Sequence, residues 1–230
     1  MKPEKKTRKI SPKSRKQGER APLSRERIEL AALDLIEENG LESFSTRKLG
    51  ELLGCEAMSI YHHFPSKAHL LNALLDRVLA ERPMPGRDNE PIERIRQIAY
   101  WYRQVGYDHP KLFQYIALHR MNGRSGLGVL NEIIGAFHDL GLESEVAAGL
   151  FRAFSYYVTG GILDETSGYA KGPSATEPVP DDEVARDFPN VLKVGPYFKP
   201  GHFAQTFATG LDIFLDAIER ASGRTGKTKR

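Results

Sequence analysis

Residues 45–71 constrain the fold of this chain more than any other segment. Leu49, Leu52 and Leu53 lie at helical spacing, just after a serine and a threonine that can cap a helix start. Gly54 then provides a turn, because glycine adopts positive φ at little cost. The segment therefore predicts a short helix, with these leucines on one face, that ends at a tight turn.

A second short helix follows the turn, and its two sides differ. Cys55 and Ile60 are expected to point back toward the first helix, while the outward side carries small or flexible side chains that fit a DNA major groove about 12 Å wide. Ser66 and Lys67 begin the next helix, where free amides and a cation form an anion site. The segment thus predicts a helix-turn-helix that binds DNA. The residues expected to contact DNA are Thr46, Arg47, Ala57, Met58, Ser59, Tyr61, His62, His63 and Lys67.

The ordered pattern from residue 24 to residue 71 resembles the DNA-binding domain of the TetR family of bacterial transcriptional regulators. It comprises an amphipathic helix at 28–39, Gly40, a capped helix at 45–53, and the run Ile-Tyr-His-His-Phe-Pro-Ser-Lys at 60–67. Gly50 departs from the pattern, because the family usually has alanine there. The resemblance implies an all-α protein: an N-terminal three-helix helix-turn-helix domain and a C-terminal helical bundle for ligand binding and dimerisation.

The distribution of charge divides the chain further. Residues 1–20 carry nine Lys or Arg and two Glu, a net charge of +7, which leaves −4 for the other residues. Such an arm favours disorder when free and adds affinity for phosphates, and it either reads bases or only solubilises the chain. The expected parts are a disordered basic arm at 1–22, a DNA-binding domain at 23–70, a ligand-binding and dimerisation domain at 71–222 and a frayed tail at 223–230.

Within the second domain, the apolar periodicity and the Pro and Gly breaks predict only helices. A glycine-rich break is expected at 122–126 and a long loop at 167–200, with one short helix around 181–188. The other expected helices cover residues 66–80, 91–107, 111–121, 127–140, 143–166 and 201–221.

Two of these helices carry wide apolar stripes, which predict a four-helix interface between two copies of the chain. A dimer would place two helix-turn-helix units about 34 Å apart, the spacing that reads a palindrome. The alternative is that the stripes only close the core of a single chain. The stripe residues are Phe151, Phe154, Val158 and Ile162 in the first helix, and Phe203, Phe207, Leu211, Phe214 and Leu215 in the second.

The second domain is also rich in aromatic residues, which as a group predict an apolar cavity with a few polar groups. Each aromatic by itself is more often a core residue, but the resemblance implies a small-molecule inducer. We expect an apolar or aromatic ligand, with the 167–200 loop long enough to serve as a lid. The expected ligand contacts are Trp101, Tyr102, Phe113, His119, Phe137, His138, Phe154, Tyr157 and Asp164.

The sequence lacks the motifs that mark other classes of protein. The sequence has no P-loop, G-x-S-x-G, CxxC or HExxH, and the pair Gly126 and Gly128 lacks a third glycine, so we expect no enzyme and no cofactor. His62 and His63 are adjacent on a helix and make a poor chelating pair, so no metal is expected. The single cysteine excludes a disulfide framework within one chain. We identify no apolar run near 18 residues and no signal peptide, and expect no membrane span and a cytoplasmic protein.

These expectations combine into one function: a homodimeric transcriptional regulator, a repressor that a small ligand releases from a palindromic operator. Its partners would be double-stranded operator DNA, the inducer and a second copy of the chain. A DNA-binding protein that acts without a ligand, or that activates transcription, remains the alternative.

Overall fold

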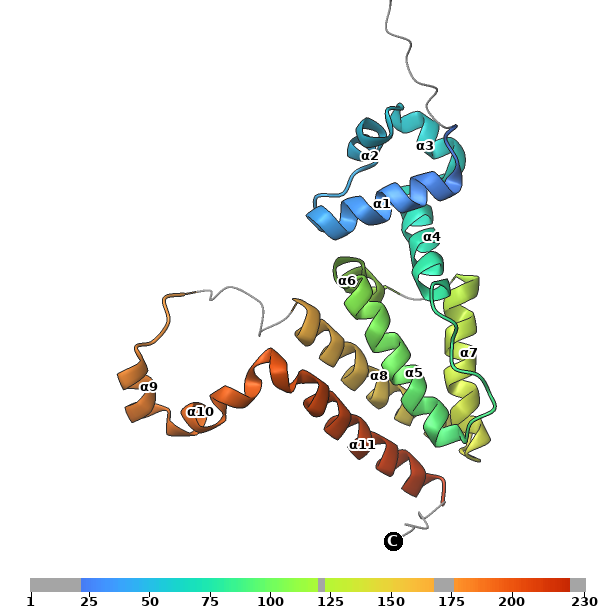
Figure 1. The fold of residues 1–230 in the computed structure, drawn as a ribbon. Helices are drawn as coiled ribbons and strands as arrows, with labels where there is room; N and C mark the ends of the chain where they lie inside the picture. Colours follow the sequence, from blue (N-terminus) through green and yellow to red (C-terminus); the bar gives the residue numbers. More distant parts are fainter. Residues whose placement is uncertain (1–21, 120–122, 168–175, 224–230) are drawn as a thin grey trace, which may run out of the picture.

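The computed structural model describes residues 22–119, 123–167 and 176–223, and in these ranges the chain forms helices, turns and no strand (Figure 1). The predicted all-α class is confirmed. Apart from residues 22 and 223, the expected basic arm at 1–22 and the expected tail at 223–230 lie outside the described residues. The helices are α1 (Arg25–Asn39), α2 (Thr46–Leu53), α3 (Ala57–His63), α4 (Lys67–Ala80), α5 (Pro91–Asp108), α6 (Pro110–Leu118), α7 (Arg124–Asp139), α8 (Ser144–Ser167), α9 (Asp181–Asp187), α10 (Pro189–Val194), η1 (Gly195–Phe198), η2 (Pro200–His202) and α11 (Phe203–Ala221).

Helices α1 to α3 and the start of α4 form a small head. Three serines begin its helices: the side chain of Ser24 accepts a hydrogen bond from Arg27 N, and Ser45 and Ser66 cap α2 and α4 in the same way. The cap at Ser24 explains why α1 begins three residues before the expected residue 28. The head core includes Ile28, Leu49 and Ile60, all at most 1 % exposed.

The remaining helices, α5 to α8 and α11, form a larger domain, here called the effector domain. Helix α5 lies at its centre and packs against α6, α7, α8 and α11. Helix α4 runs from the head to α7 and joins the two parts of the molecule (Figure 1). Any change inside the effector domain therefore has a continuous helix through which to act on the head.

Two expected breaks proved to be helical. Helix α7 begins at Arg124 and continues through Gly126 and Gly128, although a break was predicted at 122–126. Glycine lowers helix stability by only about 1 kcal/mol relative to alanine, less than burying Val129 and Phe137 on the same helix contributes. The 167–200 loop was also predicted too long. The short helix expected around 181–188 is present as α9, and α10 follows it with Pro189 at its first position.

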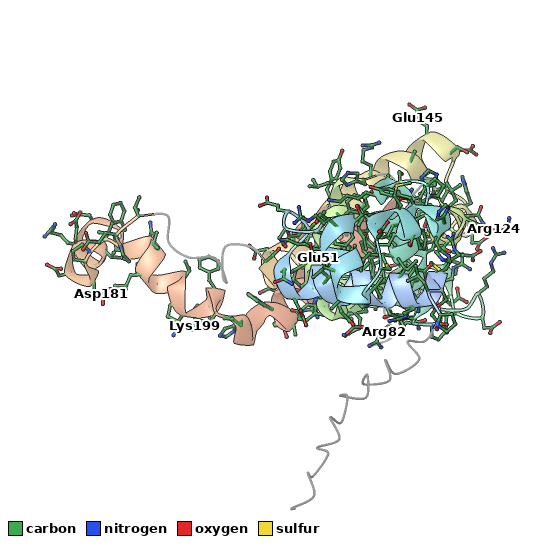
Figure 2. The ribbon with its side chains drawn as sticks, turned by 90° about the horizontal axis from the view of Figure 1, so that it is seen from above. Glu51, Arg82, Arg124, Glu145, Asp181 and Lys199 are labelled. Atoms are coloured by element: carbon green, nitrogen blue, oxygen red, sulfur yellow. The ribbon has the colours of Figure 1, made fainter. Side chains whose placement is uncertain are left out.

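The segment 176–202 forms an arm that extends away from the effector domain (Figure 1). In Figure 2, Asp181 and Lys199 lie on this arm, apart from Arg124 and Glu145 on the body. The arm carries a series of large apolar side chains with at least 44 % of their surface exposed in the single chain. They are Val179, Phe188, Val191, Leu192, Val194, Tyr197 and Phe198.

The apolar stripes of α8 and α11 are used inside the chain. Phe154, Val158 and Ile162 of α8 are at most 3 % exposed, and Phe207, Leu211 and Leu215 of α11 are at most 2 % exposed. The prediction that these side chains form an interface between two copies is therefore wrong, because α5 and the two helices themselves already cover them. Phe151, Phe203 and Phe214 are half-buried.

Among the described residues, helix α8 alone is long and apolar enough to cross a membrane. It has 24 residues and a mean hydropathy of 1.2 over an 18-residue window, so by length and composition it could cross a membrane. The expectation that no such run exists was wrong. The helix packs against α5, α6, α7 and α11, but only 22 % of the apolar window is buried in the single chain.

Candidate DNA-binding surface and effector cavity

The turn between α2 and α3 is tight because two glycines permit it. Gly54 ends α2 in the left-handed region, with φ of 70° and ψ of 36°. A Cβ added at Gly50 would lie 2.8 Å from the carbonyl oxygen of Cys55, a distance that real Cβ atoms do not adopt. The departure from the usual alanine therefore has a physical reason: in this chain the turn lies closer to α2 than alanine allows.

Leu52 is an exception among the α2 leucines. It is 60 % exposed, whereas Leu49 and Leu53 are buried. At 100° per residue, Leu49, Gly50 and Leu53 occupy one arc of the helix and Leu52 falls outside it. The prediction that all three leucines face the core was therefore wrong for Leu52.

The outward face of α3 presents the residues predicted to contact DNA bases. Met58 is 63 % exposed and His62 is exposed, while Ala57 and Ser59 are half-buried beside them. These side chains belong to one short helix, so they share a face that can approach a groove. Their direct contacts with DNA remain predictions.

The residues predicted to hold phosphates surround this face. The hydroxyl of Tyr61 lies 3.1 Å from Thr46 Oγ1, which joins α3 to the start of α2. Arg47, whose side chain is 87 % exposed, forms an ion pair with Glu51; Glu51 is labelled on the head in Figure 2. Such an exposed pair contributes little stability, so the arginine can exchange its partner for a phosphate.

Two basic residues of the head, besides carrying positive charge, form hydrogen bonds that hold its helices together. Lys67 is exposed, but its Nζ also donates a 3.0 Å hydrogen bond to the carbonyl of Phe44. The guanidinium of Arg25 lies 4.1 Å from the ring centroid of Phe64 and donates to the carbonyl of His63. It therefore holds the end of α3 against α1. This contact could not be predicted from local patterns, because 38 residues separate the partners.

A small cavity of about 80 Å³ lies between α5, α7 and α8. Its walls are apolar apart from three hydroxyl-bearing residues, Tyr102, Ser155 and Thr159. Tyr102 is hydrogen-bonded to Thr159, and burial raises the pKa of its phenol, so the group stays neutral and can donate or accept. The other lining residues are Ile98, Ala99, Val129, Leu130, Ile133, Phe151, Phe154 and Val158.

The structure brings together some of the nine residues predicted to bind ligand. Tyr102 and Phe154 line the cavity, and two fully buried rings lie behind them: Phe113 at 5.1 Å from Tyr102 and Phe137 at 6.3 Å from Phe154. Trp101 stacks on Tyr102 at 6.4 Å, and its indole N–H donates to the carbonyl of Arg82, two residues beyond the end of α4.

The other four predicted residues lie elsewhere. The Tyr157 hydroxyl donates to the carbonyl of Phe207, so that side chain holds α8 to α11. His119 stacks on Tyr115 at an exposed position, and Asp164 is exposed on α8. His138 lines a neighbouring groove of about 440 Å³ between α7 and α8.

The groove and the cavity adjoin each other, because Phe151 and Ser155 line both. The prediction from aromatic content missed most of the cavity wall, which is aliphatic. Val129 and Ile133 are four residues apart on α7, and this periodicity is the signal that marked an inward face. Which helix covers that face depends on the tertiary packing.

Within the described ranges, no group of three or more His, Cys, Asp or Glu side chains is arranged to hold a metal. A buried ion pair joins Arg103 of α5 to Glu165 of α8 at 2.7 Å, and the Tyr107 hydroxyl donates to the same carboxylate at 3.2 Å. This network joins α5 to α8 and leaves the carboxylate fully paired.

A three-helix head with a capped turn, joined to a separate helical domain, defines a helix-turn-helix DNA-binding protein. The model of the tetR family of bacterial regulatory proteins matches residues 29–74, and the model of the tetracyclin repressor-like C-terminal domain matches residues 83–221. The chain belongs to the TetR family and is a DNA-binding transcriptional regulator.

Individual relatives agree with this assignment. The HTH-type transcriptional repressor Rv1353c of Mycobacterium tuberculosis is 31 % identical over 179 residues, which cover 73 % of this chain and 69 % of the relative. The tetracycline repressor protein class A of Escherichia coli is 29 % identical over 60 % of this chain and 65 % of its own length. The structure of the Streptomyces coelicolor TetR family protein ActR in complex with actinorhodin has a TM-score of 0.70 at 24 % identity, covering 88 % of this chain and 100 % of ActR. This last likeness concerns the fold.

Proposed function

We propose that this regulator is a homodimeric repressor that leaves a palindromic operator when a small apolar or aromatic ligand binds the effector domain. The observation that carries the proposal is the apolar cavity between α5, α7 and α8, with its three hydroxyls. A cavity of this kind, apolar with a few polar groups, is the usual form of a small-molecule site. The names of the relatives support the repressor role, since two of them are called repressors.

The chemistry of the wall indicates the class of ligand. Eight of its eleven residues are apolar, and the phenol of Tyr102 is held neutral, so the wall suits an uncharged aromatic or alicyclic body with one or two hydrogen-bonding groups. ActR was solved with actinorhodin, which shows that a protein of this fold can accommodate an organic ligand. The identity of this chain's ligand is not implied by that complex.

The cavity must enlarge before it can hold such a ligand. Its volume of about 80 Å³ is well below the roughly 300–1,000 Å³ of typical ligand sites. The adjoining groove has about 440 Å³ and shares Phe151 with the cavity. Because Phe151 is only half-buried, turning its ring would connect the two spaces. A ligand that stabilises this open state shifts the protein toward it.

Dimerisation is also part of the proposal, with surfaces other than the stripes first predicted. Tyr156 of α8 and Ile213 of α11 are 65 % and 63 % exposed, and the arm at 176–202 adds its series of exposed apolar side chains. Large exposed apolar side chains gathered along one segment, as on this arm, favour an interaction site. We propose that a second copy covers it and places two heads about one helical turn of DNA apart.

The first experiment selects the operator from random DNA and then screens compounds by thermal stabilisation of the protein. Compounds that stabilise are titrated against operator-bound protein. We expect aromatic or apolar compounds to release DNA, with at least a tenfold loss of affinity. Compounds that bind without any effect on DNA would favour the ligand-independent alternative, and increased transcription from the operator would favour an activator. The cytoplasm, where the operator lies, is the proposed location.

A further inference from the structure

The head contacts the effector domain at a second place besides α4. There, the carboxylate of Glu37, near the end of α1, accepts hydrogen bonds from two backbone amides at the start of α6. Oε2 lies 3.1 Å from Lys111 N, and Oε1 lies 2.9 Å from Leu112 N. In Figure 1 the end of α1 lies next to α6, below the head.

These two amides are the ones that α6 leaves free. Residues at the start of a helix lack intrahelical acceptors, and the cap residue His109 offers no side-chain hydrogen bond. Pro110 has no N–H, and Phe113 N already donates to the carbonyl of His109. Glu37 therefore supplies from the head the whole cap of a helix in the effector domain.

A reciprocal hydrogen bond strengthens this contact between α1 and α6, here called the α1–α6 joint. The Nζ of Lys111 donates a 2.6 Å hydrogen bond to the carbonyl of Glu38, in the last turn of α1. A cation at that end and a carboxylate at the start of α6 each match the dipole of the helix they meet. Ile36 and Leu112, beside these groups, are fully buried. The α1–α6 joint thus has a buried apolar centre and hydrogen bonds at its edge.

Helix α4 alone would leave the head free to swing about one covalent connection. The Glu37 contact adds a second point at a different helix, which fixes the orientation of the head on the effector domain. In a dimer, that orientation decides the distance and angle between the two reading helices. Each base pair added between half-sites moves one of them by about 3.4 Å along the DNA and turns it by about 35°.

We propose that Glu37 is a positioning residue that sets which half-site spacing the dimer accepts. The inference rests on the proposed homodimeric function and deepens it. Glu37 is remote from the predicted DNA contacts, so its loss leaves the contacts within one half-site intact. What it changes is the freedom of each head to reach a half-site at the wrong distance.

The test uses the full-length protein and operators recovered by selection from random DNA. Duplexes carry the selected spacing, the same half-sites moved by one or two base pairs in either direction, or a single half-site. The variants are Glu37→Gln, which offers one acceptor in place of two, and Glu38→Gln. The second makes the same charge change at the exposed neighbouring residue and keeps the carbonyl that Lys111 contacts.

We expect the wild type and Glu38→Gln to lose at least tenfold in affinity when the spacing changes by one base pair. Glu37→Gln should lose threefold or less, with its affinity for the single half-site unchanged. Discrimination by Glu37→Gln equal to that of the wild type would overturn the inference. Equal wild-type affinity for every spacing would instead overturn the dimeric reading of the operator, and this inference with it.

A second variant keeps the test decisive if Glu37→Gln does not fold. Glu37→Asp keeps the charge but shortens the side chain, so that its carboxylate no longer reaches both amides. Amide hydrogen exchange should then accelerate at Lys111 and Leu112 and stay unchanged at Phe113, whose acceptor is within its own helix. The same relaxed spacing preference is expected. Slow exchange at both amides in Glu37→Asp, together with wild-type discrimination, would also overturn the inference.

Discussion

The head and the effector domain differ in how complete their binding sites are in the unliganded chain. In the head, the side chains predicted to contact DNA are already exposed on short, serine-capped helices, and Arg25 and Lys67 hold the neighbouring turns by hydrogen bonds to backbone carbonyls. In the effector domain, the cavity is only partly open and too small for a typical ligand. We therefore expect the head to meet DNA in a preformed shape, and the effector domain to change shape when a ligand binds.

This difference matters for regulation. A site that opens on binding changes the packing of α5, α7 and α8, and α4 packs against α7. In the proposed function, α4 passes such a displacement on to the head and its reading helix α3. Ligand and DNA are then coupled through the joint between the two parts, and by linkage each must affect the affinity for the other equally.

The largest expected effect separates the core of the effector domain from its surface. Leu211→Asp places a charge at a fully buried position and is expected to unfold the domain, since an unpaired buried charge costs several kcal/mol. Ile213→Asp, two residues away and 63 % exposed, should keep the melting temperature within a few degrees and give monomers by light scattering. A folded Leu211→Asp protein with a wild-type melting temperature would contradict the burial of the α11 stripe.

The next effect tests close packing in the same domain. A Cβ at Gly106 would lie 2.1 Å from Ile162 Cγ2, so Gly106→Ala should destabilise by about 1–3 kcal/mol through overpacking of α5 against α8. Gly128→Ala is the matched control, because nothing lies within 4 Å of its added Cβ. There the gain in helix propensity should stabilise by up to about 1 kcal/mol. Chemical denaturation measures both, and equal effects would contradict the α5–α8 packing.

Local signals made most of the head predictable. Serine caps and a glycine turn act within three or four residues, so Ser45, Gly54 and Ser66 fixed the boundaries of α2 and the start of α4 before the fold was known. The contact of Arg25 with His63 was not predictable, since it depends on how α1 crosses α3.

The effector domain shows the limits of the sequence more clearly. Periodicity showed that α8 and α11 each have an apolar face, but it could not show that Leu211 packs within the same chain. The cavity wall combines side chains from three helices, and aliphatic residues such as Val129 carry no chemical signal of a site. Aromatic content indicated which domain holds the cavity. Of the nine predicted ligand contacts, only Tyr102 and Phe154 line it.

A moderate effect is expected on the surface of the head. Lys67→Ala should weaken operator binding about tenfold and reduce the slope of log affinity against log salt by about 0.9, because one phosphate contact is lost. Tyr61→Phe should weaken binding less and leave the slope unchanged, because its hydroxyl is neutral. Both effects should be the same on every DNA sequence. Mobility-shift titrations at several salt concentrations measure them, and an unchanged Lys67→Ala slope would remove Lys67 from the phosphate contacts.

The smallest effect concerns the polar pair inside the cavity. Tyr102→Phe leaves the Thr159 hydroxyl without its partner and should cost about 1 kcal/mol of stability. Adding Thr159→Val removes the second group, so the double variant should be more stable than the sum of the two single changes implies. Additive losses in chemical denaturation would show that the two hydroxyls do not interact.

We propose that ligand binding in this cavity controls DNA binding, and one titration tests this proposal. Val129→Phe fills the cavity from its α7 wall, while the head is unchanged. A compound that releases the wild type from its operator is titrated against both proteins bound to the same DNA. With ligand, we expect DNA binding to weaken at least tenfold for the wild type and not at all for Val129→Phe. Without ligand, the two proteins should have equal DNA affinity. Equal release of both proteins by the compound would contradict it and place the ligand elsewhere.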